Sequence, residues 1–225
     1  MSDASTSAAV RGRVSRSRDR FWHPEDFDGP PEAVGKALAR LTTAGELRRL
    51  RRGLYWRGRS TPLGMAPPPA SRLATELIGE PGSGPAGLTA ALLLGLTTQV
   101  PRIDTIAVPG RVPRPVSGVR FVSREAAWRR RDERLRAGDV ALLEVLRSWP
   151  DLVEVPPDVA IDLVASLVGD GRIDLGRVVR ASSTEPPLVR ERLRALLRRL
   201  DLEDESDKVR PARTPIPVHA LEVLG

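Results

Sequence analysis

Most of the basic residues of this sequence are arginines, and the excess of positive over negative charge is concentrated near the start of the chain. The 225 residues carry 36 Lys+Arg and 29 Asp+Glu, which gives a net charge of +7. Residues 1–60 hold 13 of the basic and 7 of the acidic residues, so they account for a net charge of +6. A basic, compact segment beside a neutral remainder is typical of a module that binds nucleic acid. A solvated basic tail without a partner is the alternative.

The densest run of basic residues lies in a segment that we predict to be a β-hairpin over residues 46–57. Gly53 suits a turn that needs positive φ, and Leu54–Trp56 favour a strand. The arginines on or beside this hairpin are Arg48, Arg49, Arg51, Arg52, Arg57 and Arg59. They suit contacts with DNA phosphates or with the minor groove, which position a protein on DNA and carry most of the salt dependence of binding.

The segment before the hairpin predicts an amphipathic helix over residues 30–44. Prolines followed by an acidic residue are typical of a helix start, and Gly45 suits the helix end. One apolar face, spaced at i, i+4 and i+7, consists of Val34, Leu38 and Leu41. With that face in the core, the outward face holds Glu32, Lys36, Ala39 and Thr43, with Arg40 beside them.

An outward face of this composition is suited to the major groove of DNA. Basic side chains such as Lys36 and Arg40 donate hydrogen bonds to guanine, and small residues leave room for neighbouring bases. Glu32 has two interpretations. It accepts a hydrogen bond from a cytosine amino group, or it is a favourable negative charge at a helix N-terminus.

Two further elements precede this helix. Ala8–Arg18 is compatible with a first helix, and Phe21–Phe27 supplies three aromatic side chains around a short turn or helix, which we expect in the core. The arginines here either add phosphate contacts or form an exposed charged face; they are Arg11, Arg13, Arg16, Arg18 and Arg20. Helix, short helix, longer helix and basic hairpin is the order of a winged helix-turn-helix, with the longer helix as recognition helix and the hairpin as wing.

Scarce residue types exclude several function classes. The sequence has no cysteine, and its two histidines, His23 and His219, lie far apart, so we expect no metal site and no cofactor. The longest apolar stretch, Ala86–Leu96, has 11 residues, fewer than the roughly 20 that a membrane-spanning helix needs. The N-terminus has no hydrophobic signal-peptide core, so we expect a cytoplasmic protein with no membrane partner.

The proline-rich stretch Ser60–Pro69 predicts the boundary between two domains. We predict an α+β chain with a winged helix-turn-helix over residues 1–60, a linker over 61–69, a helix-rich α+β domain over 70–204 and a C-terminal arm over 205–225. The second domain is expected to contain helices over 70–79, 88–96, 140–148, 157–168, 175–181 and 188–200, and strands over 103–108 and 119–122. Trp128–Arg131 is expected to be a surface turn. The arginines of the last helix are expected to form a solvated face or, alternatively, a second phosphate-binding surface.

Two parts of the chain resemble a known family. The pattern V-x-x-A-L-x-R-L-x-x-x-G-x-L-x-R-L-R-R-G-L-Y over Val34–Tyr55, preceded by Phe27, is similar to the N-terminal domain of AbiEi-type antitoxins. Beyond the proline-rich stretch, Gly87–Gln99 resembles the helix that opens their second domain, and Ile103–Gly110 resembles the strand after it. The similarity covers about residues 15–150.

The resemblance implies a transcriptional repressor that binds inverted repeats near its own promoter, as the antitoxin of a type IV toxin–antitoxin system. Its partners would be double-stranded DNA and a nucleotidyltransferase-like toxin encoded by the adjacent gene. In this family the antitoxin is thought to counter the toxin without a tight protein complex. The alternative is a winged-helix regulator whose second domain senses a ligand or binds a protein, with no cognate toxin.

An enzyme is the competing class, and no catalytic pattern supports it. A nuclease of the restriction-endonuclease type needs an acidic residue two positions before a lysine, but Val34 and Ser206 occupy those positions before Lys36 and Lys208. The sequence also lacks a Walker A loop and a G-x-S-x-G nucleophile elbow. A third possibility, compatible with DNA binding, is an adaptor whose second domain holds a toxin or a second copy of the chain. The oligomeric state stays open.

Overall fold

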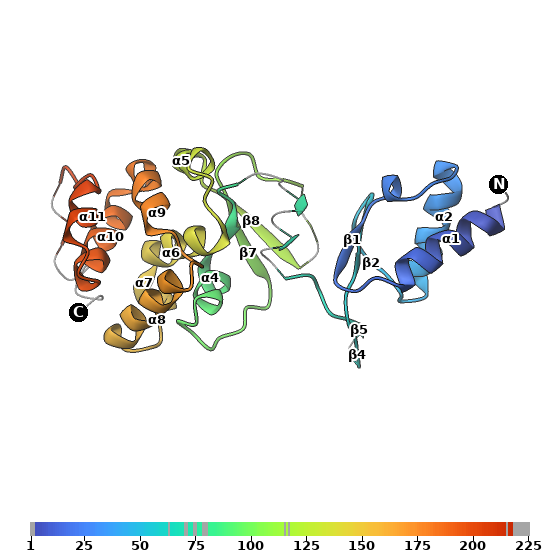
Figure 1. Cartoon of the computed structure of the whole chain (residues 1–225), viewed down its shortest axis with the longest axis horizontal. Helices are drawn as coiled ribbons and strands as arrows, with labels where there is room; N and C mark the ends of the chain where they lie inside the picture. Colours follow the sequence, from blue (N-terminus) through green and yellow to red (C-terminus); the bar gives the residue numbers. More distant parts are fainter. Residues whose placement is uncertain are drawn as a thin grey trace. The chain divides into compact units, whose positions relative to one another are not determined.

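The computed structural model describes residues 3–62, 64–69, 72–73, 76–77, 81–114, 116, 118–214 and 216–217. The chain divides into two compact units, Met1–Pro69 and Ala70–Gly225, which we call the N-terminal and the C-terminal unit. In Figure 1 the colours run from blue in the N-terminal unit to red at the end of the C-terminal unit. Both units mix helices with small sheets, as the predicted α+β class requires.

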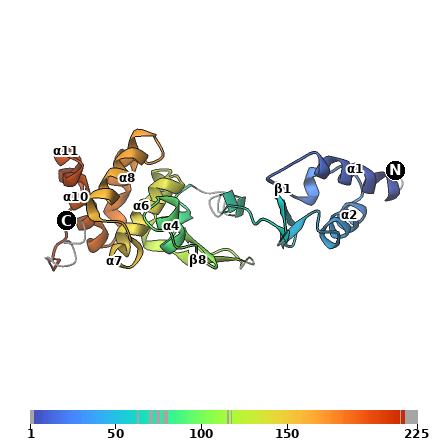
Figure 2. The ribbon, with the colours of Figure 1, turned by 90° about the horizontal axis from the view of Figure 1, so that it is seen from below.

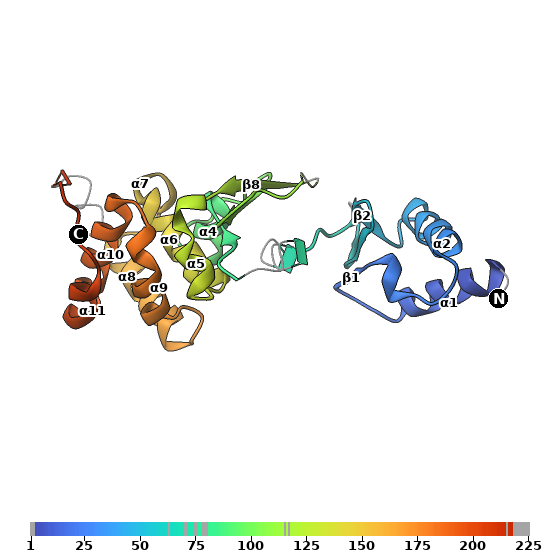
Figure 3. The same ribbon diagram turned by 90° about the horizontal axis from the view of Figure 1, so that it is seen from above.

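The N-terminal unit packs helices on an antiparallel sheet of strand order β1-β3-β2. Its elements in chain order are α1 (Asp3–Ser15), β1 (Arg20–Trp22), the 3-10 helix η1 (Pro24–Asp26), α2 (Pro31–Thr43), β2 (Arg48–Arg51) and β3 (Leu54–Arg57). Helices α1 and α2 lie on the same side of this sheet (Figures 2 and 3). The predicted hairpin over residues 46–57 is therefore present as β2 and β3.

The core of this unit forms because the apolar stripe of α2 faces α1 and the sheet. Val34, Leu38 and Leu41 are at most 5% exposed, so the predicted stripe is confirmed. They share one apolar cluster with Ala37 of the same helix and with residues from α1, the sheet and the connecting segments, which are Val10, Val14, Trp22, Phe27, Leu47 and Tyr55. The helix predicted over residues 30–44 is α2, Pro31–Thr43.

The two elements before α2 differ from the prediction. Helix α1 begins and ends earlier than the predicted Ala8–Arg18. Phe21 and Trp22 belong to strand β1, which pairs with β3, whereas a turn or short helix was expected. Backbone pairing across the unit overrides the local pattern there, and the short helix is confined to η1. Trp22 is buried and stacks on Phe27 with ring centroids 5.0 Å apart, which confirms the core position of these two rings.

The N-terminal unit extends to Pro69, so it includes the predicted linker over residues 61–69, and the first part of that linker is in a hairpin. Strands β4 (Ser60–Thr61) and β5 (Gly64–Met65) form a small antiparallel hairpin. The Trp56 indole Nε1 donates a hydrogen bond to the carbonyl oxygen of Ala66 at 2.9 Å. Gly58 permits this fold-back, because a Cβ atom there would lie 2.6 Å from the same carbonyl oxygen. Residues 66–69 have neither helix nor strand.

The C-terminal unit combines a three-stranded sheet of order β6-β7-β8 with a layer of helices that lies on one side of it (Figures 1 and 2). Strands β7 and β8 are parallel, and β6 is antiparallel to β7. The elements are β6 (Gly84–Pro85), α4 (Gly87–Leu93), β7 (Asp104–Val108), β8 (Val119–Ser123), η2 (Glu125–Ala127), α5 (Arg129–Asp132), α6 (Ala137–Arg147), α7 (Trp149–Leu152), α8 (Pro157–Gly169), α9 (Leu175–Ala181), η3 (Ser182–Thr184), α10 (Pro187–Arg199) and α11 (Glu203–Lys208).

Helix α6 is the centre of this unit. Every residue from Asp139 to Leu146 is buried, because α6 contacts α4 and β6 on one side and α9 and α10 on the other. Burial of this run of Val, Ala and Leu side chains supplies much of the apolar area that stabilises the fold. The run also contains two carboxylates, Asp139 and Glu144, which must find partners in the interior.

The expected helices of the second domain are present as α4, α6, α8, α9 and α10, with ends that differ by up to three residues. Residues 72–73 and 76–77 of the expected helix 70–79 are helical, and the rest of that segment lies outside the described residues. The prediction of a C-terminal arm is wrong at its start, because α11 packs against α10, and Ser206 and Val209 are buried. Residue 215 and residues 218–225 of that arm lie outside the described residues. Within the described part of the chain, no helix is long and apolar enough to cross a membrane.

Candidate nucleic-acid interface

Helix α2 presents the predicted polar face to solvent. Its stripe of Val and Leu side chains is held in the core, and this fixes the rotation of the helix about its own axis. The exposed residues on the opposite face are Glu32, Lys36, Ala39, Arg40 and Thr43, which are the five side chains predicted to face outward. The Thr43 hydroxyl donates to the carbonyl oxygen of Ala39 at 3.2 Å, so part of its hydrogen-bonding capacity is used within the helix.

The hairpin β2–β3 carries the second part of the candidate interface. Arg48 pairs with Trp56 and Arg49 with Tyr55, and the register then shifts before Arg51 pairs with Leu54. The turn between the strands contains Gly53 in the left-handed region, with a φ of 76°. Arg49 and Arg52 are exposed, and Arg48 and Arg51 are partly exposed.

The basic side chains of α2 and of the hairpin are electrostatically available. Among the described residues, these cations have no ion pair and no side-chain hydrogen bond; they are Lys36, Arg40, Arg48, Arg49, Arg51 and Arg52. A guanidinium group that has no carboxylate partner has no opposite charge beside it, and its fork of donors is available to a phosphate. Glu32 is the acidic residue on the exposed face of α2, and it lies in the first turn.

Arg57 was predicted to belong to the interface, but its side chain is engaged within the fold. Its guanidinium donates from Nε to the carbonyl oxygen of Ser17 at 2.8 Å and from Nη1 to the carbonyl oxygen of Glu46 at 3.3 Å. These bonds tie the end of β3 to the segment after α1 and to the segment after α2. Because its donors are committed to backbone carbonyls, Arg57 has a structural role, and we remove it from the candidate interface.

Most arginines of the α1 region also have partners within the unit. Arg11 forms an ion pair with Glu46 at 2.6 Å. Arg13 donates to the carbonyl oxygen of Asp26 at 2.5 Å, and its guanidinium lies within 6 Å of two aromatic rings. Arg20 lies 4.2 Å from the Trp22 ring centroid. Of this group, Arg16 and Arg18 are without a partner among the described residues and are compatible with phosphate contacts.

A cleft of about 610 Å³ adjoins the C-terminal end of α2. Arg18 and Arg59 line it together with the structural Arg57 and with Glu46. The sequence placed Arg59 beside the hairpin but gave no indication that Arg18 would share a cleft with it. The cleft extends the basic surface of this unit beyond the hairpin itself.

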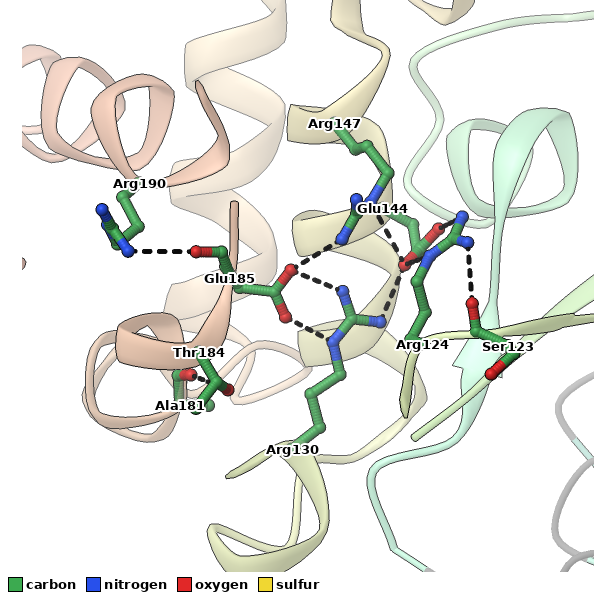
Figure 4. Close-up of polar contacts among 9 residues, drawn as sticks. All are labelled: Ser123, Arg124, Arg130, Glu144, Arg147, Ala181, Thr184, Glu185 and Arg190. Carbon is green, nitrogen blue, oxygen red and sulfur yellow. Dashed lines mark hydrogen bonds and ion pairs between the residues drawn. The ribbon is translucent and has the colours of Figure 1, made fainter. Parts of the chain in front are cut away.

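A second group of charged residues, in the C-terminal unit, was missed by the sequence analysis (Figure 4). Arg130 is fully buried and binds two carboxylates: Nε and Nη2 donate to Glu185 at 2.6 and 2.9 Å, and Nη1 donates to Glu144 at 2.8 Å. Arg124 binds Glu144 through two further hydrogen bonds of 2.9 and 2.8 Å. Arg147 donates to Glu185 at 3.0 Å.

This buried network has a structural function. It connects α5, α6, the end of β8 and the segment before α10 through charge-assisted hydrogen bonds. Burial raises the pKa of the Glu144 carboxyl, but hydrogen bonds and positive charges from Arg124 and Arg130 outweigh burial, and its pKa lies below the ordinary value. The surface turn expected at Trp128–Arg131 is therefore wrong at Arg130. The signal that could have found the network is Glu144 itself, a carboxylate inside an otherwise apolar run.

The arginines of α10 also differ from the prediction of a solvated face. Arg192 in α10 is 4% exposed and donates to the carbonyl oxygen of Leu146 at 2.9 Å, so it is not part of a solvated face. Arg194 donates to the carbonyl oxygen of Val209 at 2.9 Å. Among the described residues, no group of three or more His, Cys, Asp or Glu side chains could hold a metal ion.

Comparisons with known proteins find a likeness in structure and none in sequence. No family model matches the sequence, and no curated protein matches it significantly. Among solved structures, the crystal structure of the RV2827C protein from Mycobacterium tuberculosis is similar, with a TM-score of 0.54 and 19% sequence identity. The aligned part covers 95% of this chain and 84% of that chain, so the likeness extends over both units. At this level of identity it establishes a shared α+β fold.

Proposed function

We propose that this protein is a sequence-specific DNA-binding regulator whose N-terminal unit is a winged helix-turn-helix. Helix α2 is the recognition helix, and the β2–β3 hairpin is the wing. The element order supports this assignment, since α1, β1, η1, α2 and the hairpin follow one another as they do in that class of domain. Strand β1 pairs with β3 and completes the three-stranded sheet to which the hairpin belongs.

The strongest support comes from unpaired positive charge on two consecutive elements. Lys36 and Arg40 on α2 are exposed without carboxylate partners among the described residues. At the hairpin turn, Arg52 is exposed and Arg51 is partly exposed, and neither has such a partner. Elsewhere in the same unit, Arg11, Arg13, Arg20 and Arg57 contact Glu46, backbone carbonyls or aromatic rings. Arg16, Arg18 and Arg59 are exposed without such contacts among the described residues. A group of exposed, unpaired cations on α2 and the hairpin is what a polyanion-binding surface requires.

The proposed biological role is that of an antitoxin that represses its own operon. The resemblance of Val34–Tyr55 and Gly87–Gln99 to AbiEi-type antitoxins supports this role. The inferred partners are double-stranded DNA with inverted repeats and a nucleotidyltransferase-like toxin encoded by the neighbouring gene. The toxin is a functional partner, and a physical complex is not required.

Gel-shift titration of the intact chain tests DNA binding. We expect the duplex upstream of its own gene to bind about a thousandfold more tightly than a random duplex of the same length and at the same salt concentration. Equal affinity for both duplexes would reduce the proposal to non-specific binding, and no shift with either would refute it. Expression of the adjacent open reading frame with and without this chain tests the antitoxin role. Growth arrest that this chain does not relieve would refute that role.

A further inference from the structure

The C-terminal unit contains a polar pocket that the DNA-binding proposal does not use. It has a volume of about 470 Å³, within the range of roughly 300–1,000 Å³ typical of small-molecule sites. Residues from α5, α9, η3, α11 and the segment after α11 line it. Helix α9, labelled in Figure 1, contacts both α5 and α11. The pocket is therefore lined by elements that are distant in sequence.

The lining is strongly basic. Four cations contribute to it, namely Arg129, Arg180, Lys208 and Arg210. The acidic residue in the lining is Glu205, which binds Lys208 at 2.5 Å. Glu133 lies beside the pocket and pairs with Arg180 at 2.7 Å and with Arg129 at 3.9 Å. In the lining itself one carboxylate faces four cations, and Glu133 and Asp174 act on Arg180 from beside the pocket. Positive charge is therefore in excess at the pocket.

Arg210 is the cation that most clearly lacks a role in the fold. Its side chain is exposed and has no ion pair or hydrogen bond among the residues described. The hydroxyl of Ser183 adds a further donor, since its bond to the carbonyl oxygen of Arg180 is long at 3.5 Å. Convergent guanidinium, ammonium and hydroxyl donors match the oxygens of a phosphate group.

An exposed tryptophan adjoins this site. Trp128 is 50% exposed, and the guanidinium of Arg129, a residue of the pocket lining, lies 5.5 Å from its ring centroid. The ring is held next to a basic pocket although it contributes little to the core. Its fluorescence should therefore respond when a ligand draws Arg129 toward the pocket.

We propose that this pocket binds a small molecule that carries a diphosphate group. The volume and the number of cations exceed what one phosphate needs, and two linked phosphates can engage cations from α5, α9 and α11 together. The ligand would thereby join the helices that surround the pocket. The site belongs to the C-terminal unit alone, so it depends neither on the recognition helix nor on the wing.

Isothermal titration of the intact chain with inorganic pyrophosphate tests the site, with ADP and adenosine as further probes. We expect saturable binding of pyrophosphate and ADP with a dissociation constant below about 1 mM at 0.1 M salt, and no binding of adenosine. Arg210→Ala and Lys208→Ala should each weaken pyrophosphate binding about tenfold, the scale of one lost charge-assisted hydrogen bond. The matched control is Arg198→Ala, an exposed arginine outside the pocket, which should bind like the unaltered chain.

Several outcomes would overturn the proposal. They are absence of saturable pyrophosphate binding, an equal loss in Arg198→Ala, and a tryptophan fluorescence response that persists in Trp128→Phe and in Arg210→Ala. Loss of DNA affinity in Arg210→Ala without any pyrophosphate binding would assign the pocket to DNA phosphates instead. If pyrophosphate does not bind but upstream DNA does, the pocket proposal is wrong and the proposed function stands. If pyrophosphate binds but upstream DNA does not, DNA recognition is wrong and the pocket proposal stands.

Discussion

We expect the double substitution Arg51→Ala/Arg52→Ala to weaken DNA binding by a predictable amount and to reduce its dependence on salt. Both side chains lie at or next to the hairpin turn, and neither forms an ion pair or a side-chain hydrogen bond among the described residues. Their removal therefore costs the fold little. Any loss of affinity reports on contacts with DNA.

The size of the effect follows from counterion release. Each phosphate contact contributes about 0.9 to the slope of log affinity against log salt concentration, so loss of two contacts lowers the slope by about 1.8. At 0.1 M salt this corresponds to roughly 60-fold weaker binding. Since phosphates are common to all sequences, upstream and random duplexes should lose affinity by the same factor.

Fluorescence anisotropy with labelled duplexes between 50 and 200 mM salt, the range over which such slopes are clearly resolved, measures both quantities. The charge-matched control is Arg102→Ala/Arg198→Ala, which removes two exposed arginines of the C-terminal unit. Its slope should equal that of the unaltered chain. An unchanged slope in the hairpin variant, or the same decrease in the control, would show that net charge rather than the hairpin governs binding.

Three further predictions concern α2 and the buried network. Lys36→Ala or Arg40→Ala should cost about 1–3 kcal/mol on upstream DNA and much less on random DNA in the same gel shift, and an equal loss on both would contradict base reading. Glu185→Gln should lower the free energy of unfolding by about 3 kcal/mol, because it leaves the fully buried guanidinium of Arg130 with one carboxylate fewer. Urea unfolding followed by circular dichroism measures this change, and Glu203→Gln, at an exposed position, is the control. A decrease no larger than that of the control would contradict the prediction. In the folded protein the pKa of Glu144 lies below its ordinary value of 4.5. The ionised Glu144 carboxylate therefore stabilises the fold fully above pH 4.5, and this stabilisation is lost as the pH falls from 4.5 through the folded pKa. Glu144→Gln should reduce the dependence of the unfolding free energy on pH below 4.5.

Local pattern was sufficient to predict much of the N-terminal unit. The spacing of Val34, Leu38 and Leu41 determines which side of α2 is buried, and so it also determines that Lys36 and Arg40 are exposed. Helix periodicity is a property of neighbouring residues and can be read without knowledge of distant partners. The hairpin was predicted for the same reason, because a glycine that permits positive φ lies between two strand-forming segments.

Which charges meet in space was decided by the tertiary structure alone. Arg57 and Arg52 are close in sequence and chemically identical, yet one donates to backbone carbonyls and the other extends into solvent. Arg130 lies in a basic run typical of a surface, but Glu185, 55 residues later, reaches it in the interior. The physical reason is that an arginine can be buried only where carboxylates or carbonyl oxygens from other elements compensate its charge. Those partners are brought together by long-range packing, which no local spacing encodes.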